Sequence, residues 1–346
     1  MNGELRKPHD EGVTVTEGEN RRAAFDITKG TRPVKALSEA EVEECLDLSE
    51  LLDGLEDGFR RLELGEVQSP PRPEITVPGK GYSLSMPAWA PGQQMCVKIV
   101  NVFDGNLDIG LPNHLAVITL FDPETGAATC IMDGTYITGV RTSGAAVLSA
   151  RLLGRTDARV ATVIGAGVQG REHLRLLPLI RDFDRINVCS LYHEDARDLA
   201  DRFELARAVA DTEAAVRESD IVCLATYSET PVIDPSWVGP GTHVSSVGVR
   251  PPGGELPTAL AAEHKLFVET LDAFEPPQVG SAELAGIDPA HGTTLGAVVV
   301  DPRRGRTNDT EITVYKGMGI GMEDMVAANL AYRRATAAET GQTYNW

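Results

Sequence analysis

The sequence lacks the features that mark several common classes of protein. Its five cysteines are widely spaced and form no C-x-x-C pair, which favours reduced thiols over a disulfide framework or a zinc site. It also lacks an N-terminal apolar segment of the signal-peptide type and any apolar run long enough to cross a membrane. We therefore expect a cytoplasmic protein that does not span a membrane.

Basic residues are scarce as well, since 32 Lys and Arg stand against 51 Asp and Glu, a formal net charge of −19. This charge argues against nucleic acid or an anionic membrane as a partner. An anionic small-molecule substrate would need cations placed locally in its binding site. The histidines show no metal-ligand spacing, and no Ser/His/Asp order has the context of a hydrolase triad, so neither a metal site nor a hydrolase is expected.

The sequence does contain a glycine-rich segment that predicts a dinucleotide site. Val160–Ile164 is a short β-branched run, typical of a buried parallel strand, and Gly165, Gly167 and Gly170 follow it as G-x-G-x-x-G. In this motif the first glycine makes the tight turn, the second lets a pyrophosphate approach, and the third lets the next helix pack on the strand. That helix N-terminus holds the phosphates. An ordinary glycine turn would not require strand, turn and helix in this order.

The pattern along the chain predicts an α/β protein with two domains. Residues 1–31 are polar and unpatterned, which is typical of a flexible arm. Helices are expected over 48–64 and 140–153, and short apolar runs between turn residues over 75–132 predict a β-rich meander. From 160 to 269 strands and helices alternate, which is the doubly wound, Rossmann-type signature.

The expected domain boundaries follow from these changes of pattern. We place a Rossmann-type nucleotide-binding domain at 135–309. A strand at 311–316 and an alanine-rich helix at 323–340 come after it, and that helix is expected to pack back on the N-terminal domain. The second domain, α+β in class, is then expected to comprise 32–134 and 310–346.

Three cations lie beside turns or within an apolar strand rather than on a solvated helix face. Arg72 lies in Pro-Pro-Arg-Pro, Lys98 in Val-Lys-Ile-Val-Asn, and Arg141 in Thr-Gly-Val-Arg-Thr-Ser-Gly. Strand alternation leaves the ammonium of Lys98 facing inward or into a cleft. A buried lysine needs a partner or a depressed pKa, and both are typical of functional sites. The alternative for each cation is a surface position on an edge strand or loop.

A series of short motifs runs in order from about residue 37 to residue 335. They are 67–73, Met86-Pro-Ala, Lys98-Ile-Val-Asn, Gly110-Leu-Pro, Leu120-Phe-Asp, Met132-Asp-Gly, Arg141-Thr-Ser, 165–170, Val247-Gly and Tyr315-Lys-Gly-Met. In this order they resemble the ornithine cyclodeaminase/μ-crystallin family. That family includes ornithine and lysine cyclodeaminases, alanine dehydrogenases, ketimine reductases and dehydrogenases of diaminopropionate-type amino acid biosynthesis, so the resemblance specifies no single activity.

The resemblance implies a homodimer whose 32–134 and 310–346 domain supplies the dimer sheet and the substrate floor, beside a Rossmann domain that binds a nicotinamide cofactor. It implies that Arg72 and Arg141 grip the substrate carboxylate and that Lys98 contacts the carboxylate or the reacting nitrogen. A bidentate arginine is the best fixed partner for a planar carboxylate.

The resemblance and the glycine motif together define a set of expected cofactor contacts. They are Thr142, Ser143, Gly165, Ala166, Gly167, Val168, Gln169, Gly170, Ser190, Ala225, Thr226, Val247 and Gly248. Ser190 stands where the acidic residue that reads the ribose 2′-hydroxyl is expected, and no carboxylate is there to repel a 2′-phosphate. Arg197 could approach from the next helix, so we expect a modest preference for NADP over NAD.

One departure from the family pattern bears on the reaction. Cyclodeaminases of this family carry an aspartate shortly after the Val-Gly motif, whereas here Arg250 stands near that place, and Glu255 could substitute only if the loop folded back. Arg250 would suit a second substrate carboxylate, or it is a solvated loop residue.

These observations predict an NAD(P)H-dependent reductase of a C=N bond next to a carboxylate, an imino acid or cyclic ketimine, with Lys98 as the catalytic residue. Substrate binding is expected from Arg72, Lys98, Arg141 and Arg250. One alternative is an ornithine-like cyclodeaminase with recycled NAD. The other is a non-catalytic, μ-crystallin-like binder of NADPH or another ligand, which would not need Lys98.

Overall fold

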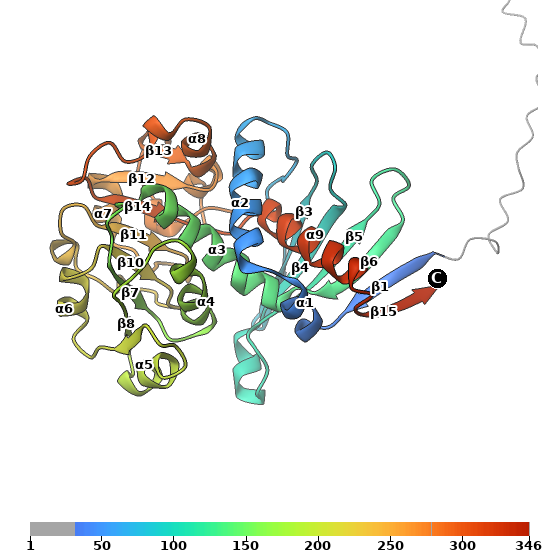
Figure 1. Ribbon diagram of the computed structural model, residues 1–346, viewed down its shortest axis with the longest axis horizontal. Helices are drawn as coiled ribbons and strands as arrows, with labels where there is room; N and C mark the ends of the chain where they lie inside the picture. The colour runs from blue at the N-terminus through green and yellow to red at the C-terminus, as the bar shows by residue number, and fades with distance from the viewer. Residues whose placement is uncertain (1–31, 278, 346) are drawn as a thin grey trace, which may run out of the picture.

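The computed structural model describes residues 32–277 and 279–345, so the arm expected at 1–31 lies outside the described residues. Two β-sheets lie side by side, and helices fill the space between and around them (Figure 1). No helix in the described part of the chain is long and apolar enough to cross a membrane.

The first sheet has seven strands in the order β15-β1-β6-β5-β4-β3-β2. Their bounds are β1 Pro33–Leu37, β2 Glu74–Val77, β3 Gly81–Ala88, β4 Met95–Val102, β5 His114–Phe121, β6 Ala128–Asp133 and β15 Gln342–Asn345. The strands β2 to β6 form the expected antiparallel meander, in which each strand pairs with the next along the chain. The C-terminal strand β15 pairs with β1 at the edge of this sheet.

Four helices pack against this sheet or against one another beside it. They are α1 (Glu39–Cys45), α2 (Leu48–Glu63), α3 (Thr135–Leu153) and α9 (Gly321–Ala337). The helix α9 lies across β3 and β4 and is also packed on α2 and α3, so it is buried on most of its surface (Figure 1). Ser38 and Glu41 form the capping box that opens α1.

The second sheet has eight strands, all parallel, in the order β13-β12-β14-β11-β10-β7-β8-β9. The strands are β7 Val160–Ile164, β8 Arg185–Cys189, β9 Ala206–Ala208, β10 Ile221–Leu224, β11 His243–Ser246, β12 Lys265–Val268, β13 Gly292–Thr294 and β14 Thr313–Lys316. The connecting α-helices are α4 Val168–Leu176, α5 His193–Ala200, α6 Thr212–Arg217, α7 Thr258–Glu263 and α8 Leu295–Val300.

The chain enters this sheet at β7, adds β8 and β9 on one side, and then adds β10 and β11 on the other. The side on which successive strands are added therefore changes between β7 and β10. Doubly wound sheets bind their ligands at such a point of reversed strand order. This is the α/β, Rossmann-type architecture that the sequence predicts.

Two expectations need correction at the element level. The strand β14 was placed with the first domain, in 310–346, but it is hydrogen-bonded between β11 and β12 and so belongs to the Rossmann sheet. Only α9 and β15 return from that range to the first sheet. The helix α3 begins at Thr135, earlier than the expected residue 140, because the Asp133 carboxylate accepts hydrogen bonds from the N–H groups of Thr135 and Tyr136.

Candidate active site

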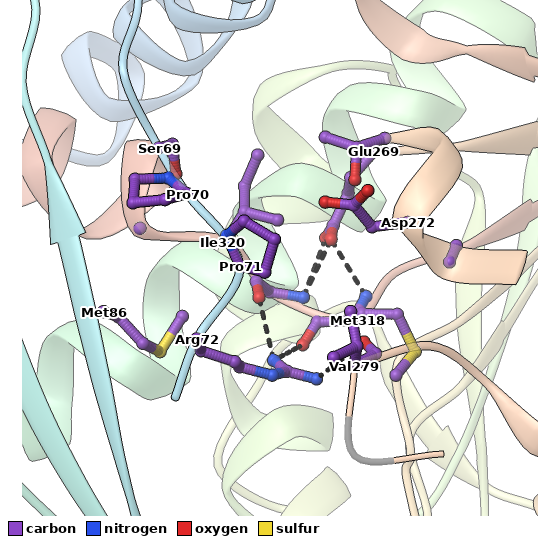
Figure 2. A pocket seen from close by; sticks show the side chains of 14 residues that line it. Ser69, Pro70, Pro71, Arg72, Met86, Glu269, Asp272, Val279, Met318 and Ile320 are labelled. Atoms are coloured by element: carbon purple, nitrogen blue, oxygen red, sulfur yellow. Dashed lines mark hydrogen bonds between the residues drawn. The ribbon is translucent and has the colours of Figure 1, made fainter. Parts of the chain in front are cut away.

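A pocket opens where the first sheet meets the carboxyl edge of the Rossmann sheet (Figure 2). One wall consists of the connector 69–72 and Met86 of β3. The other consists of residues 269–273, after β12, and residues 318–321, between β14 and α9. Parallel strands end together at one edge of a sheet, which is why loops so far apart in sequence share this pocket.

Arg72 lies in this pocket, and its guanidinium donates hydrogen bonds to the carbonyl oxygens of Met318 at 2.9 Å and Gly319 at 3.0 Å. Burial lowers the pKa of Arg72, although a guanidinium stays charged at any pH of interest. Its partners are neutral carbonyls, so a substrate carboxylate entering the pocket could replace them with a stronger, charge-assisted interaction.

Glu269 holds the same short segment from the opposite side. Its carboxylate accepts hydrogen bonds from the N–H of Met318 at 3.0 Å and from the N–H of Gly319 at 2.8 Å. Two consecutive residues are thus held by a cation that binds their carbonyl groups and an anion that binds their N–H groups (Figure 2). Residues 317–321, which we call the glycine strap, contain glycine at 317, 319 and 321.

Lys98 lies on the inner face of β4 and is fully buried, with 0% of its surface exposed. Its ammonium is 2.8 Å from each carboxylate oxygen of Asp324, on α9, which is also fully buried. Burial, and then the charge of Arg141, lowers the pKa of Lys98 from 10.5 to about 8, while Asp324 opposes the shift. The sequence prediction of an inward-facing lysine with a partner is what the geometry shows.

Arg141, on α3, is 3% exposed and is held by two acids of α9. Its Nε donates to Asp324 at 2.8 Å and its Nη1 donates to Glu323 at 2.6 Å. Those acids raise the pKa of Arg141 despite the opposing effect of burial. From the sequence we expected the guanidinium of Arg141 to be free to bind a substrate carboxylate. Two of its N–H donors instead bind acids of the protein, which leaves Nη2 for a ligand.

Glu323, the neighbour of Asp324 on α9, is buried close to a second acid, Glu269. Burial and the nearby Glu269 carboxylate hold the pKa of Glu323 well above its usual range, although Arg141 opposes this. Its Oε1 has no hydrogen-bond partner among the described residues.

The glycine motif has the geometry of a dinucleotide-binding turn. Gly165 has a φ of 121°, and a β-carbon there would lie 2.2 Å from the carbonyl oxygen of Ala225. A β-carbon on Gly170 would lie 2.0 Å from the carbonyl oxygen of Gly165, so the helix packs closely on the turn. Gly167, the N-cap of α4, has no atom near its β-carbon position and faces open space. These residues fit a pyrophosphate at the helix N-terminus.

Other expected cofactor contacts support this turn. The Ser143 hydroxyl donates to the Gln169 side chain at 2.7 Å, whereas the Thr142 hydroxyl donates to the carbonyl of Thr138 in its own helix. Ala166 and Val168 flank Gly167 in the motif, and Val168 is exposed.

Ser190 follows β8 directly, so it lies at the same carboxyl edge of the sheet. Arg197 of α5 has no ion-pair partner among the residues that the structure describes, whereas Glu194 and Asp195 occupy the first turn of that helix. The charge around the ribose-reading position is therefore mixed.

The remaining cofactor contacts are joined by one buried carboxylate, Glu255. It accepts hydrogen bonds from the N–H and hydroxyl of Thr226 at 2.6 and 2.7 Å, and from the N–H groups of Val247 at 3.1 Å and Gly248 at 2.6 Å. Ser246 adds a fifth donor at 2.9 Å. The loop does fold back, but Glu255 is fully buried and both oxygens are occupied, so it lacks a free carboxylate oxygen for substrate chemistry.

Arg250 is not among the residues that line the pocket. It forms an ion pair with Glu229 at 3.1 Å, donates to the carbonyl of Tyr227 and stacks on the Tyr227 ring. Its side chain is 41% exposed. In this conformation the guanidinium is engaged within its own loop, and its expected contact with a second substrate carboxylate stays a prediction.

Three acids of this site, Glu269, Glu323 and Asp324, were missed from the sequence. Two of them carried a signal, because Met322-Glu323-Asp324-Met325 puts adjacent acids between methionines in an otherwise apolar helix. Glu269 carried none, since an acid after a parallel strand is common in loops.

The chain is similar to known proteins over most of its length. The model of the ornithine cyclodeaminase/mu-crystallin family matches residues 34–339. The alanine dehydrogenase of Archaeoglobus fulgidus is 31% identical over 313 residues, 88% of this chain and 96% of that protein.

Two solved structures match over almost the same extent. One is Thermococcus litoralis Delta(1)-pyrroline-2-carboxylate reductase in complex with NADH and L-proline, with a TM-score of 0.83, 31% identity and coverage of 89% of this chain and 99% of that chain. The other is an archaeal alanine dehydrogenase dimer with bound NAD, with a TM-score of 0.83, 30% identity and coverage of 90% and 99%. Together these likenesses confirm the fold class expected from the sequence.

Proposed function

This chain belongs to the ornithine cyclodeaminase/mu-crystallin family, and we propose that it is an NAD(P)H-dependent reductase of an imino acid or cyclic ketimine. The observation that carries the proposal is the buried ammonium of Lys98, which lies with Arg141 behind a pocket at the carboxyl edge of the Rossmann sheet. A protein that only binds a ligand has no need for a buried lysine whose pKa is about 8.

The residues of the site divide the reaction between them. A bound NAD(P)H would supply a hydride to the imine carbon. Arg72 and the free Nη2 of Arg141 hold the substrate carboxylate. The Lys98 ammonium gives a proton to the nitrogen as the C=N bond becomes CH–NH. The resulting neutral amine of Lys98 then takes a proton from water.

The walls of the pocket favour a small substrate with one carboxylate. Pro70, Pro71, Met86, Val279 and Ile320 supply mostly apolar surface around Arg72. The T. litoralis relative binds L-proline, a compact amino acid of this kind. Because Arg250 lies outside the pocket lining and is paired with Glu229, we propose a substrate such as Δ1-pyrroline-2-carboxylate over a dicarboxylic imine, which would need Arg250 to leave that partner.

The decisive test is a spectrophotometric screen of NADPH and NADH oxidation. Substrates would be cyclic ketimines, and pyruvate, glyoxylate and oxaloacetate with and without ammonia or amines. We expect turnover with a ketimine, and a Lys98→Met variant should lose kcat more than substrate affinity because the ammonium acts mainly in the transition state. No oxidation with any imine would contradict the proposal.

A cyclodeaminase would instead consume ornithine and release ammonia with catalytic NAD. Glu255 is the first acid after Val247-Gly248, and both of its carboxylate oxygens already accept hydrogen bonds within the protein. No free carboxylate of this loop is therefore left to act on the amines of ornithine. Ammonia release from ornithine without net cofactor consumption would reverse the assignment.

We further propose that the working form is a cytoplasmic homodimer joined through the outer face of the first sheet. Ile99 and Val117 are cross-strand partners on that face and are 39% and 51% exposed, which is costly for an isolated chain. The archaeal alanine dehydrogenase relative is a dimer. All five cysteines are free and buried, which suits a reducing compartment. Sedimentation equilibrium measures the mass directly.

A further inference from the structure

We propose that Asp324 is the positioning residue that keeps Lys98 protonated and holds its ammonium at the substrate nitrogen, a role that rests on the proposed reduction of a C=N bond. Asp324 follows the glycine strap by three residues and reaches β4 and α3 from α9. It is not among the residues that line the pocket, so it would act through Lys98 rather than on the substrate.

The first argument is geometric. Asp324 is the only hydrogen-bond partner of the Lys98 ammonium within residues 32–277 and 279–345, at 2.8 Å, and the same carboxylate accepts from Arg141 Nε at 2.8 Å. One rigid group therefore fixes both cations relative to each other. An ammonium has three donors, so two remain to meet a substrate after Asp324 has taken one.

The second argument is electrostatic and depends on every charged or titratable group around Lys98. Arg141 of α3 is always charged and disfavours a second cation, as does burial. Cys96 of β4 and His114 of β5 face Lys98 as neutral groups, because burial raises the pKa of Cys96 and lowers the pKa of His114. Their dipoles cannot replace a charge.

The acids of α9 complete this environment. Burial and Glu269 raise the pKa of Glu323, and its hydrogen bond goes to Arg141 Nη1 at 2.6 Å, whereas it forms neither a hydrogen bond nor an ion pair with Lys98 in the described part of the chain. Asp324 is thus the anion that keeps the ammonium charged between Arg141 and the apolar core. Burial alone makes Lys98 a better acid, and Asp324 prevents it from losing its proton before substrate binds.

The sign of the pH dependence follows. A general acid works only when it is protonated. The kcat/KM for imine reduction should therefore be at its full value at pH values below the Lys98 pKa of about 8, and should fall at higher pH. Asp324→Asn removes the opposite charge, which lowers the pKa of Lys98 and moves this alkaline limb to lower pH. An opposite charge at this distance shifts a pKa by about 1–3 units, so the loss at pH 8 should be at least about fivefold and smaller at pH 6.

The experiment compares the pH profiles of kcat/KM for wild type, D324N, E323Q, D324E and K98R. The E323Q variant is the matched control, since it changes the adjacent acid of the same helix, which is bonded to Arg141 and not to Lys98, and it should move the alkaline limb much less than D324N does. D324E keeps the charge and should also keep the limb, with a lower kcat from its displaced carboxylate. Should D324N fail to fold, D324S takes its place, as a neutral residue that leaves room for water beside Nζ.

A second readout does not depend on turnover. In protein labelled with 13C at the lysine ε-carbon, the Lys98 signal is the one missing from K98R, and its titration should move to lower pH in D324N. A limb and a titration that stay at the wild-type pH in D324N, with an equal loss of rate at every pH, would show that Asp324 is only a structural ion-pair partner.

The variant K98R separates this proposal from the proposed function. Arginine does not titrate, so a limb that persists unchanged in an active K98R enzyme would belong to the substrate and would overturn the role of Lys98 itself. A limb that disappears in K98R but does not move in D324N would overturn the role of Asp324 alone.

Discussion

A β-carbon placed on Gly319 would lie 2.1 Å from Nη1 of Arg141. Gly319 has a φ of 75°, in the left-handed region, and Arg141 cannot retreat because Glu323 and Asp324 hold it. The glycine strap therefore packs directly on the cation that it covers, and its sequence is restricted both by conformation and by space.

This contact predicts that Gly319→Ala lowers both stability and kcat/KM. The strain of a positive φ costs about 1 kcal/mol in the free energy of unfolding, and displacement of Arg141 adds to it. Gly79→Ala is the matched control, because Gly79 has a φ of 69° but no atom near its β-carbon position. Urea unfolding should show a lower free energy of unfolding in both variants. Steady-state kinetics should show a lower kcat/KM only in G319A. Equal values of kcat/KM in the two variants would show that the close contact of Gly319 with Arg141 does not matter for activity.

Arg141→Lys should lower kcat/KM about ten- to a hundredfold, which corresponds to the loss of about 1.5–3 kcal/mol of charge-assisted hydrogen bonding. A lysine ammonium cannot reach Asp324, Glu323 and a ligand at once, as the planar fork does. Cofactor affinity, measured by the fluorescence of bound NADPH, should stay within about twofold of wild type. A variant with normal kcat/KM would show that Arg141 serves only the fold.

Gly167→Val should abolish nucleotide binding while leaving the fold intact. The β-carbon position of Gly167 is open and its φ is −84°, so a side chain is tolerated there by the protein but occupies the space where we expect the pyrophosphate. Gly239→Val is the control, since Gly239 is also open but lies away from the motif. Calorimetry with NADPH measures the affinity, and undiminished binding by G167V would place the cofactor elsewhere.

We expect a modest preference for NADPH, because no carboxylate stands at Ser190 and Arg197 is free to approach a 2′-phosphate. Arg197→Ala should then raise the KM for NADPH and leave the KM for NADH unchanged. Two acids in the first turn of α5 limit the preference. A kcat/KM that favours NADH tenfold, about 1.4 kcal/mol, would mean that another residue reads the ribose.

Glu255→Gln should reduce the free energy of unfolding by about 2–4 kcal/mol, because an amide group would point two hydrogens at backbone and hydroxyl donors that now bind a carboxylate. Glu229→Gln, at an exposed ion pair with Arg250, should cost less than about 0.5 kcal/mol. Denaturant unfolding of both variants checks this. Equal stabilities would show that the Glu255 hydrogen bonds contribute little.

The sequence predicted the elements whose signals are local. The glycine motif, the meander and the amphipathic helix α2 all depend on spacing within a few residues, and each is present. The placement of β14 was wrong because strand order in a parallel sheet depends on long-range pairing, and the short run at 313–316 gives no sign of its neighbours.

The cations of the site were found, but their partners were not. Lys98 was conspicuous as a charge in an apolar strand, whereas the adjacent acids Glu323 and Asp324 were passed over despite the methionines that flank them, because acids are ordinary in the first turn of a helix. Only the packing of α9 across β4 turns them inward. The guanidinium of Arg141 was therefore expected to be unpaired. Nothing in the local sequence indicates that two acids more than 180 residues away bind it.

The pairing of β1 with β15 has a consequence for biosynthesis. Residues 33–37 leave the ribosome long before residues 342–345, so one edge of the first sheet stays open while the whole Rossmann sheet is made. Lys98 and Arg141 likewise have no counter-charge until α9 emerges, and they remain hydrated until that helix docks. The active site and the first domain's core are thus completed in one late step, and the rate of that step is set by contacts between the two halves of the chain.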